Sequence, residues 1–331
     1  MLFPKQMEQR GDKPALCQIS GDAENNEGGW LGIVLFLHGV GIVPYCHKPI
    51  NRVARVSNAA HNRIYMKVDY IHSPAAKDED ACFVQEDLFG VFDGFNGWSR
   101  FFDESGTSGG RVAAEIARDA FLHEQGDLKN IGITANERIR GHLQKHGVDI
   151  GDSAVLYGTM FAVARVIENT IAWAQIGDAN GMIIARDRGF RLFTQDYDHD
   201  KEVLALWKRY ADEKKENIRE LINEPLLALR QNMNITHGCL NGDKRAEKFI
   251  NTGAESLDTL KHVIIFTDGL IIPKQDPSEP DDWKLFVDLF LEGGLRRIER
   301  HVRDLEESDP KCWTYPRYKQ FDDIAAISLS F

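Results

Sequence analysis

Short apolar runs patterned like β-strands alternate with polar turn signals over most of the chain. Residues 63–70 alternate apolar and polar side chains with a period of two, which is typical of a strand with one buried face. Two adjoining runs, 82–85 and 88–92, flank Glu86-Asp87 and predict a tight hairpin. Further strands are predicted at 160–167, 170–176, 182–185, 262–267 and 324–331, with a turn at Glu168-Asn169. Short consecutive strands of this kind favour antiparallel pairing.

Helical periodicity separates these blocks of strands. Residues 110–124 place apolar side chains near one face, and Thr134-Ala135-Asn136-Glu137 is a capping box that predicts a second helix ending near Gly147. Further helices are predicted over residues 200–222, with a break at Pro225, and from Trp283 to about Leu305. Residues 226–260 carry no clear pattern. The order of strands, two helices, strands, helix and strand indicates a layered α+β protein.

The N-terminal part of the chain differs from this layout. Residues 1 to about 28 are polar and glycine-rich, and we predict that they form an N-terminal extension. The stretch from Trp30 to Tyr45 is the most apolar of the chain, but it is short for a membrane span and contains His38 and several glycines. We interpret it as a buried pair of strands. Without repeats or a low-complexity linker, residues 1–331 are predicted to form a single domain.

Composition and charge exclude several classes of function. The 331 residues carry a formal net charge of -11, which argues against nucleic acid as a partner. The five cysteines are widely spaced and form no Cys-x-x-Cys pair, so neither a disulfide framework nor a zinc site is indicated. No signal peptide is predicted either. We therefore expect an intracellular protein, cytoplasmic or nuclear, that does not bind membranes.

Acidic pairs stand at the ends of the predicted strands. They are Glu79-Asp80, Asp93-Gly94, Gly177-Asp178, Asp268-Gly269 and Asp322-Asp323. A single Asp-Gly pair usually marks only a turn. Several carboxylates gathered at strand ends repel one another unless cations neutralise them, and oxygen ligands are what Mg²⁺ and Mn²⁺ prefer. The set therefore predicts a site for more than one metal ion. The histidines, His199 among them, are not at metal-ligand spacings and are predicted to be surface or core residues.

In this order the motifs resemble those of the metal-dependent Ser/Thr protein phosphatases of type 2C, the PPM family. The matching segments are Asp78-Glu79-Asp80-Ala81, residues 88–94 (LFGVFDG), residues 157–160 (YGTM), residues 175–179 (QIGDA), residues 192–196 (LFTQD), residues 264–270 (IIFTDGL) and Asp322-Asp323-Ile324. The resemblance spans residues 78–331 and is specific as an ordered set. It implies a four-layer α-β-β-α sandwich with two central antiparallel sheets and metals in a cleft at one edge.

The resemblance also implies a role for each acidic residue. Asp93 would bridge two Mn²⁺ or Mg²⁺ ions, and the carbonyl of Gly94 would bind one of them. Asp268 and Asp322 would hold the other ion. Glu79 and Asp80 would orient metal-bound waters, and Asp178 would contribute to a third, weaker metal position. The catalytic residues would then be Asp93, Asp268 and Asp322.

Departures from the family pattern concern the substrate more than the metals. Phe95 stands where family members usually have a histidine that protonates the leaving alkoxide, and losing a general acid typically costs about 10²–10⁴ in rate. Ala75 stands where many members have an arginine that clamps the phosphate. Lys77, on the same face if this segment is an extended strand, could supply a charge to the substrate phosphate. Asp323 replaces an asparagine and either adds charge to the site or faces solvent. Residues 200–250 are predicted to be a divergent helical insertion in the family's flap, the mobile segment that shapes the choice of substrate.

The predicted function is hydrolysis of phosphoserine and phosphothreonine in proteins by a metal-bridging hydroxide, in a monomer whose partners are its phosphoprotein substrates. An alternative is a pseudophosphatase that keeps the fold and serves as a binding or scaffolding module, which Ala75 and Phe95 favour. A third alternative is an unrelated acidic metal-binding sandwich.

Overall fold

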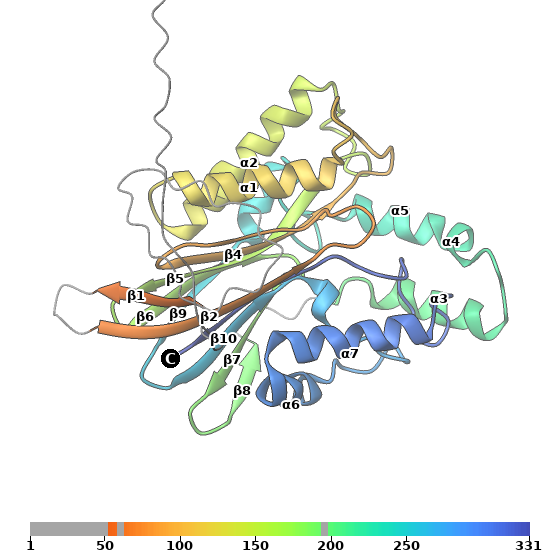
Figure 1. The fold of residues 1–331 in the computed structure, drawn as a ribbon. Coiled ribbons are helices and arrows are strands. Elements are labelled where there is room, and N and C mark those ends of the chain that lie inside the picture. Colours follow the sequence, from red (N-terminus) through yellow and green to blue (C-terminus); the bar gives the residue numbers. More distant parts are fainter. Residues whose placement is uncertain (1–51, 58–62, 193–197) are drawn as a thin grey trace, which may run out of the picture. The chain divides into compact units, whose positions relative to one another are not determined.

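A computed structural model describes residues 52–57, 63–192 and 198–331 of the chain (Figure 1). The predicted N-terminal extension at residues 1–28, the predicted strand pair at 30–45 and most of the 192–196 motif lie outside the described residues. No helix within the described part is long and apolar enough to cross a membrane.

Two antiparallel sheets form the centre of the described chain. The first contains six strands in the order β1 (Arg52–Ser57), β2 (Arg63–Ser73), β11 (Ile324–Ser330), β10 (Leu260–Phe266), β7 (Asn180–Ala185) and β8 (Phe190–Leu192). The second contains five strands in the order β3 (Ala81–Val84), β4 (Leu88–Phe95), β5 (Gly158–Ile167), β6 (Thr170–Ile176) and β9 (Asn251–Ser256). The predicted hairpins β3–β4 and β5–β6 are confirmed.

The two sheets pack face to face through one apolar core. Val91 of β4, Ala162 of β5, Ile265 of β10 and Ile327 of β11 belong to this core and are at most 1% exposed. Their neighbours in sequence point to the opposite faces of the sheets, since side chains alternate along a strand. Both faces of the central strands are therefore largely buried, which explains why their sequences are mostly apolar.

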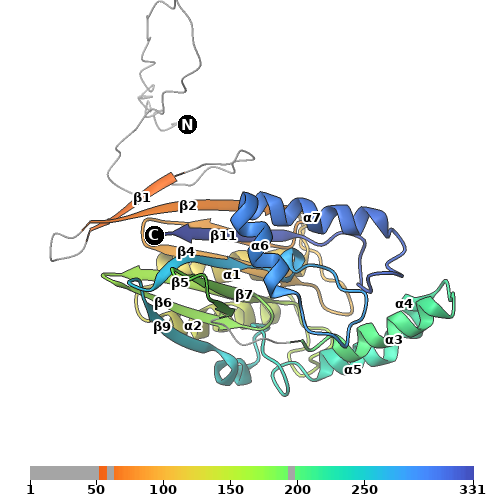
Figure 2. The ribbon, with the colours of Figure 1, turned by 90° about the horizontal axis from the view of Figure 1, so that it is seen from below.

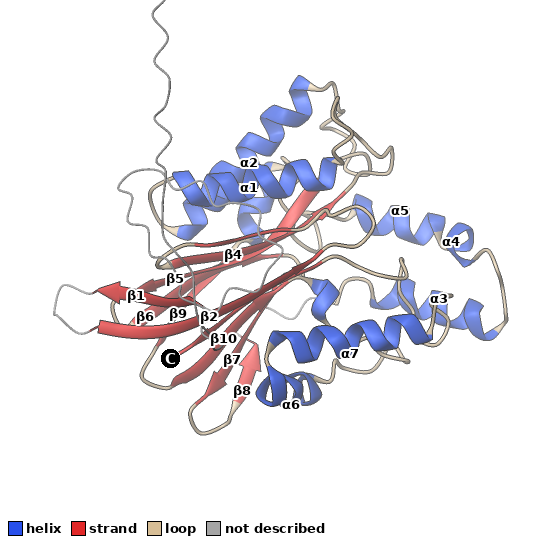
Figure 3. Cartoon of the chain, in the orientation of Figure 1, coloured by secondary structure: helices blue, strands red, loops and turns tan. Residues whose placement is uncertain are grey.

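Helices cover the two outer faces (Figures 1 and 3). Helices α1 (Gly109–His123) and α2 (Leu128–Lys145) pack on the five-stranded sheet. Helices α6 (Trp283–Gly293) and α7 (Leu295–Ser308) pack on the six-stranded sheet. The predicted four-layer α-β-β-α sandwich is thus confirmed.

Residues 200–250 are largely helical, but the helix predicted over residues 200–222 is divided in two by residues 213–217. They contain α3 (Lys201–Asp212), α4 (Ile218–Leu221), α5 (Asn223–Gln231) and the 3-10 helix η1 (Lys244–Phe249) (Figure 2). Val203, Trp207 and Ile218 form a small core with Cys312. The Trp207 indole N–H donates to the Cys312 carbonyl oxygen at 2.7 Å. This contact fixes the helical segment to the loop that precedes β11.

Some predicted boundaries are wrong. Helix α2 begins at Leu128, because the Asp127 side chain accepts from the Asn130 N–H and caps it; the Thr134 capping box lies inside the helix. Pro225 does not break a helix but lies in the first turn of α5, where a missing N–H is tolerated.

The predicted single helix from Trp283 to about Leu305 is two helices. Gly294 lies between α6 and α7 and has φ +68°, a left-handed conformation that ends α6. In addition, Asp93-Gly94 is not a turn after a strand. Both residues lie within β4, where they pair with Met160 and Thr159 of β5.

Candidate metal centre

The five acidic motifs meet at one end of the sandwich. Asp93 lies near the end of β4, and Asp178 lies in the turn between β6 and β7. Asp268 opens the 3-10 helix η2 (Asp268–Leu270) directly after β10. Glu79 and Asp80 precede β3, and Asp322 precedes β11. Because β10 and β11 are antiparallel neighbours, the end of one and the start of the other lie side by side.

The segment that carries Glu79 and Asp80 is held by buried polar contacts. The Asp323 carboxylate is 2% exposed and accepts from the Ala75 N–H at 2.5 Å and the Glu79 N–H at 2.9 Å. The Arg111 guanidinium of α1 donates to the Asp80 carbonyl oxygen at 2.5 Å. Asp323 therefore does not face solvent; it orders the backbone beside the site.

Burial and repulsion raise the pKa of Asp80 and Asp93. Burial raises the pKa of Asp80 well above its usual value, and the charges of Asp323 and Asp322 raise it further. Burial likewise raises the pKa of Asp93, reinforced by Asp268 and Asp80. Such mutual effects are those of carboxylates that lie near one another.

Two basic side chains offset part of this negative charge. Burial raises the pKa of Asp322 to about 7 although Lys319, whose Nζ lies 2.5 Å from Asp322 Oδ1, opposes the shift. Burial also raises the pKa of Asp178 to about 7 against the opposing charge of His199, whose Nε2 lies 3.7 Å from Asp178 Oδ2. Burial alone would lower the pKa of His199, but Asp200, Asp178 and Asp268 outweigh it and raise that pKa.

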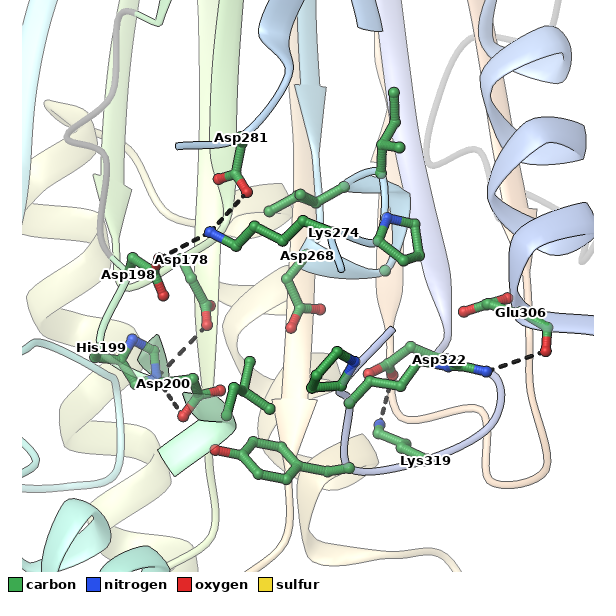
Figure 4. A pocket seen from close by; sticks show the side chains of 18 of the residues that line it. Asp178, Asp198, His199, Asp200, Asp268, Lys274, Asp281, Glu306, Lys319 and Asp322 are labelled. Carbon is green, nitrogen blue, oxygen red and sulfur yellow. Dashed lines mark hydrogen bonds and ion pairs between the residues drawn. The ribbon is translucent and has the colours of Figure 1, made fainter. Parts of the chain in front are cut away.

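A pocket of about 180 Å³ opens on this end of the sandwich (Figure 4). Asp178, Asp268 and Asp322 line it, and Figure 4 shows their carboxylates facing the same space. Lys319 and His199 flank this group. Glu79, Asp80 and Asp93 do not line the pocket. Glu79 and Asp80 are buried and Asp93 is half-buried, behind the carboxylates that line the pocket.

The sequence did not predict His199 and Lys319 as site residues. His199 stacks on His237 at 4.4 Å between ring centroids and lies between Asp178 and Asp200. Its only signal in the sequence is the acidic neighbourhood Asp198-His199-Asp200. Lys319 comes from the loop before β11, and no motif marks it.

Lys77 is placed differently from the prediction. The segment after β2 bends at residues 76–77 and is not an extended strand, so Lys77 is not aligned with Ala75 and Glu79. Its side chain is exposed. A contact of Lys77 with substrate stays a prediction, without the strand geometry that suggested it.

The donor atoms suit a hard divalent cation. Buried oxygen atoms without a hydrogen-bond partner include Glu79 Oε1, Asp80 Oδ2 and Asp178 Oδ1, and such atoms are costly unless a cation or water satisfies them. Among the described residues, no three His, Cys, Asp or Glu side chains already stand in ligand geometry around one point. The carboxylates are thus neighbours that fit Mn²⁺ or Mg²⁺ in chemistry and do not form a closed cage.

The stability of the metal-free protein should fall as the pH rises from about 4 to 7. Asp178 and Asp322 have a pKa of about 7 in the folded protein, against about 3.9 in an unfolded chain. The folded state therefore keeps protons that the unfolded state has lost, and raising the pH favours unfolding. Each pKa unit corresponds to about 1.4 kcal/mol, which is an upper limit here because both groups are partly exposed to solvent.

Urea unfolding in the presence of a chelator, between pH 5 and pH 8, measures this dependence. In the double variant Asp178→Asn/Asp322→Asn the decline should be much flatter, and added Mn²⁺ should reverse it in the wild type because the ions bind the charged carboxylates. An unchanged slope in the double variant would show that these two residues do not cause it.

Among known proteins, only solved structures match this chain, and they match it by fold. No protein-family model and no curated protein matches the sequence. A crystal structure of the catalytic domain of the serine/threonine protein phosphatase PstP in complex with two manganese ions matches with a TM-score of 0.50 and 15% identity, over 80% of this chain and 97% of that one. PstP/Ppp of Mycobacterium tuberculosis matches with a TM-score of 0.50 and 16% identity, over 80% and 98%.

PppA of Pseudomonas aeruginosa, a regulatory component of its T6SS, matches with a TM-score of 0.50 and 15% identity. The match covers 81% of this chain and 99% of that one. At these identities the likeness concerns the fold alone. The chain therefore has the fold of the type 2C Ser/Thr protein phosphatases.

Proposed function

We propose that this protein hydrolyses phosphoserine and phosphothreonine in proteins with the help of Mn²⁺ or Mg²⁺. The observation that carries the proposal is the cluster of Asp80, Asp93, Asp178, Asp268 and Asp322 at one end of a Ser/Thr phosphatase fold. An excess of buried carboxylates costs stability, so its presence calls for a function that uses it. The two manganese ions of the PstP catalytic domain support the choice of metal.

Asp93, Asp268 and Asp322 would hold two ions, together with the Gly94 carbonyl. Glu79 and Asp80 would act through bound water, and Asp178 would serve a third position. When bound, the ions supply positive charge that activates water and neutralises the phosphoryl oxygens. Asp323 and Arg111 keep the backbone of residues 75–80 in place for this task. Lys319 neutralises Asp322 as long as no other cation does.

The leaving group would find no proton donor at residue 95. The Phe95 side chain is half-buried and packs against the core between the sheets. Water must then protonate an alkoxide that leaves from serine or threonine, whereas an aryl oxide leaves without help. We therefore expect slower turnover of phosphothreonine than of an aryl phosphate.

A pseudophosphatase is the second candidate, and the surroundings of Phe95 and Ala75 favour it. The Ala75 N–H is engaged with Asp323 and its side chain carries no charge. A domain with this constellation could bind phosphoproteins without turning them over. It would still use the acidic cluster to bind a metal ion.

The test is Mn²⁺-dependent hydrolysis of 4-nitrophenyl phosphate and of a phosphothreonine peptide by the purified protein. We expect turnover of both, faster on the aryl ester, and loss of both in EDTA or in the variant Asp93→Asn. Turnover that survives EDTA would contradict the metal mechanism. No turnover of either substrate by protein with a cooperative unfolding transition would favour the pseudophosphatase.

A further inference from the structure

An arginine of the helical insertion lies against Phe95. The Arg230 guanidinium carbon, from α5, is 5.9 Å from the centre of the Phe95 ring. Arg230 Nη1 donates to the Asn96 carbonyl oxygen at 2.7 Å. This is the single hydrogen bond that the Arg230 side chain forms within the described chain. The Arg230 guanidinium thus lies beside Phe95, the last residue of β4, which follows Asp93 by two positions.

A second arginine of the insertion lies beside the pocket. The Arg219 guanidinium carbon, from α4, is 5.5 Å from the centre of the Tyr318 ring. Tyr318 lines the pocket together with Asp268 and Asp322. Arg219 is exposed, and Arg230 is half-buried. Arg219 therefore contacts a residue of the pocket wall, and Arg230 contacts Phe95, which follows Asp93 by two residues in β4; neither arginine lines the pocket itself.

Neither arginine has a carboxylate partner. Within the described residues, Arg219 and Arg230 form no ion pair, whereas Arg111, Arg303 and Arg317 each pair with an acidic side chain within 3.2 Å. Burial lowers the pKa of Arg230, and the charge of Arg219 lowers it further, while Asp200 and Glu79 oppose this effect. The two guanidinium groups thus influence each other electrostatically, and both contact aromatic residues that are close in sequence to acidic residues of the site.

An arrangement of this kind suits a phosphate group. A guanidinium offers paired N–H donors that match two phosphate oxygens, and two cations that form no ion pair within the described chain gain most from a doubly charged anion. A phosphoryl group that enters an acidic site gains from positive charge in addition to that of bound ions. Lys274, Arg317 and Lys319 line the pocket, but each pairs with an acidic side chain, and neither Ala75 nor the exposed Lys77 supplies charge there.

We propose that Arg230 and Arg219 bind the phosphoryl group of the substrate, so that the helical insertion supplies the phosphate-binding residues of this protein. The inference rests on the proposed function for its substrate class. It assigns the insertion a role in recognising the phosphate rather than only the surrounding polypeptide.

The test measures binding without turnover. The probe is a labelled peptide with a non-hydrolysable phosphonate in place of the threonine phosphate. Fluorescence anisotropy in Mn²⁺ compares its affinity with that of the same peptide carrying an unmodified threonine. We expect the wild type to prefer the phosphonate peptide, Arg230→Gln to lose about 10- to 100-fold of that preference, and Arg219→Gln to lose somewhat less. Arg230→Lys should restore only part of it, since an ammonium lacks the planar fork.

Arg209→Gln is the matched control. Arg209 lies on α3 of the same segment and stacks over Tyr210 at 5.0 Å, whereas Arg219 and Arg230 contact Tyr318 and Phe95. Its variant should keep the wild-type preference. Thermal unfolding of all four variants shows that differences in binding do not come from loss of fold.

The outcomes separate this inference from the proposed function. If the wild type hydrolyses 4-nitrophenyl phosphate but Arg230→Gln binds the phosphonate peptide as well as the wild type, the inference is wrong and the function stands. If no hydrolysis occurs but the preference depends on Arg230, the function is wrong and the inference stands. A wild type without preference, or an equal loss in Arg209→Gln, would also overturn the inference.

Discussion

Asp268→Asn is expected to lower Mn²⁺-dependent hydrolysis of 4-nitrophenyl phosphate by at least about 10³-fold, because a metal ligand contributes several kcal/mol to the transition state. Asp268 is the acidic residue that the others share. Its charge raises the pKa of Asp93, Asp178 and Asp322, and it lines the pocket. The initial rate at saturating Mn²⁺ measures the effect.

The same substitution should stabilise the protein in the absence of metal. An amide at residue 268 removes one charge from a cluster in which buried carboxylates repel one another, so less free energy opposes folding. Activity and stability are therefore expected to change in opposite directions. This combination distinguishes a lost ligand from a damaged fold, which would lower both.

Asp281→Asn is the matched control for Asp268→Asn. Asp281 lines the same pocket but pairs with Lys274 at 3.1 Å. Its variant should retain activity within a few-fold and gain no stability. If both variants lost activity equally, the effect would reflect the charge of the pocket as a whole and not a ligand at residue 268.

The sandwich could be predicted because its central strands are buried on both faces. Residues 88–92, 262–267 and 324–331 read as strands in the sequence because most of their side chains are apolar and pack in a core on one face of the sheet or the other. The acidic residues could be predicted for a related reason. Acidic side chains at the ends of apolar strands lie at the edge of a sheet, and the order of the five acidic pairs resembles the ordered motifs of the PPM family.

Local signals failed where tertiary contacts decide the structure. The capping box at Thr134 is a sound sequence signal, but residues 128–133 are already helical because Ile131 packs in the core under the five-stranded sheet. Pro225 reads as a helix breaker until its place in the first turn is known. Helix propensity shows which helix boundaries are favourable, and tertiary packing determines which of them the folded chain adopts.

The basic side chains of the site could not be predicted at all. His199 and Lys319 come from loops outside the ordered motifs, and their positions depend on how residues 200–250 and the loop before β11 pack. Trp207 and Ile218 join residues 200–250 to Cys312 of the loop before β11. A sequence pattern along one element contains no information about such a contact between distant segments.

Gly94→Ala is expected to destabilise the protein by about 3 kcal/mol or more and to weaken Mn²⁺ binding in whatever protein still folds. A Cβ at residue 94 would lie 2.5 Å from the Gly110 carbonyl oxygen and would also collide with the Glu79 carbonyl oxygen. Both are backbone atoms, so no side chain can turn away to make room. The glycine of this Asp-Gly pair is required for close packing of β4 against α1 and the Glu79 segment, not for a turn.

Gly141→Ala tests whether the effect depends on this packing. Gly141 lies in α2, and a Cβ there would meet no atom within 4 Å, so alanine should stabilise the helix by up to about 1 kcal/mol. Urea unfolding and calorimetric titration with Mn²⁺ measure both variants. Equal stability of Gly94→Ala and the wild type would mean that β4 can move away from Glu79 at no cost. Asp93 and Gly94 are adjacent in β4, so a movement of Gly94 would also move Asp93. If Gly94→Ala had both the stability and the Mn²⁺ affinity of the wild type, the close approach of these backbones would not be the feature that positions the site.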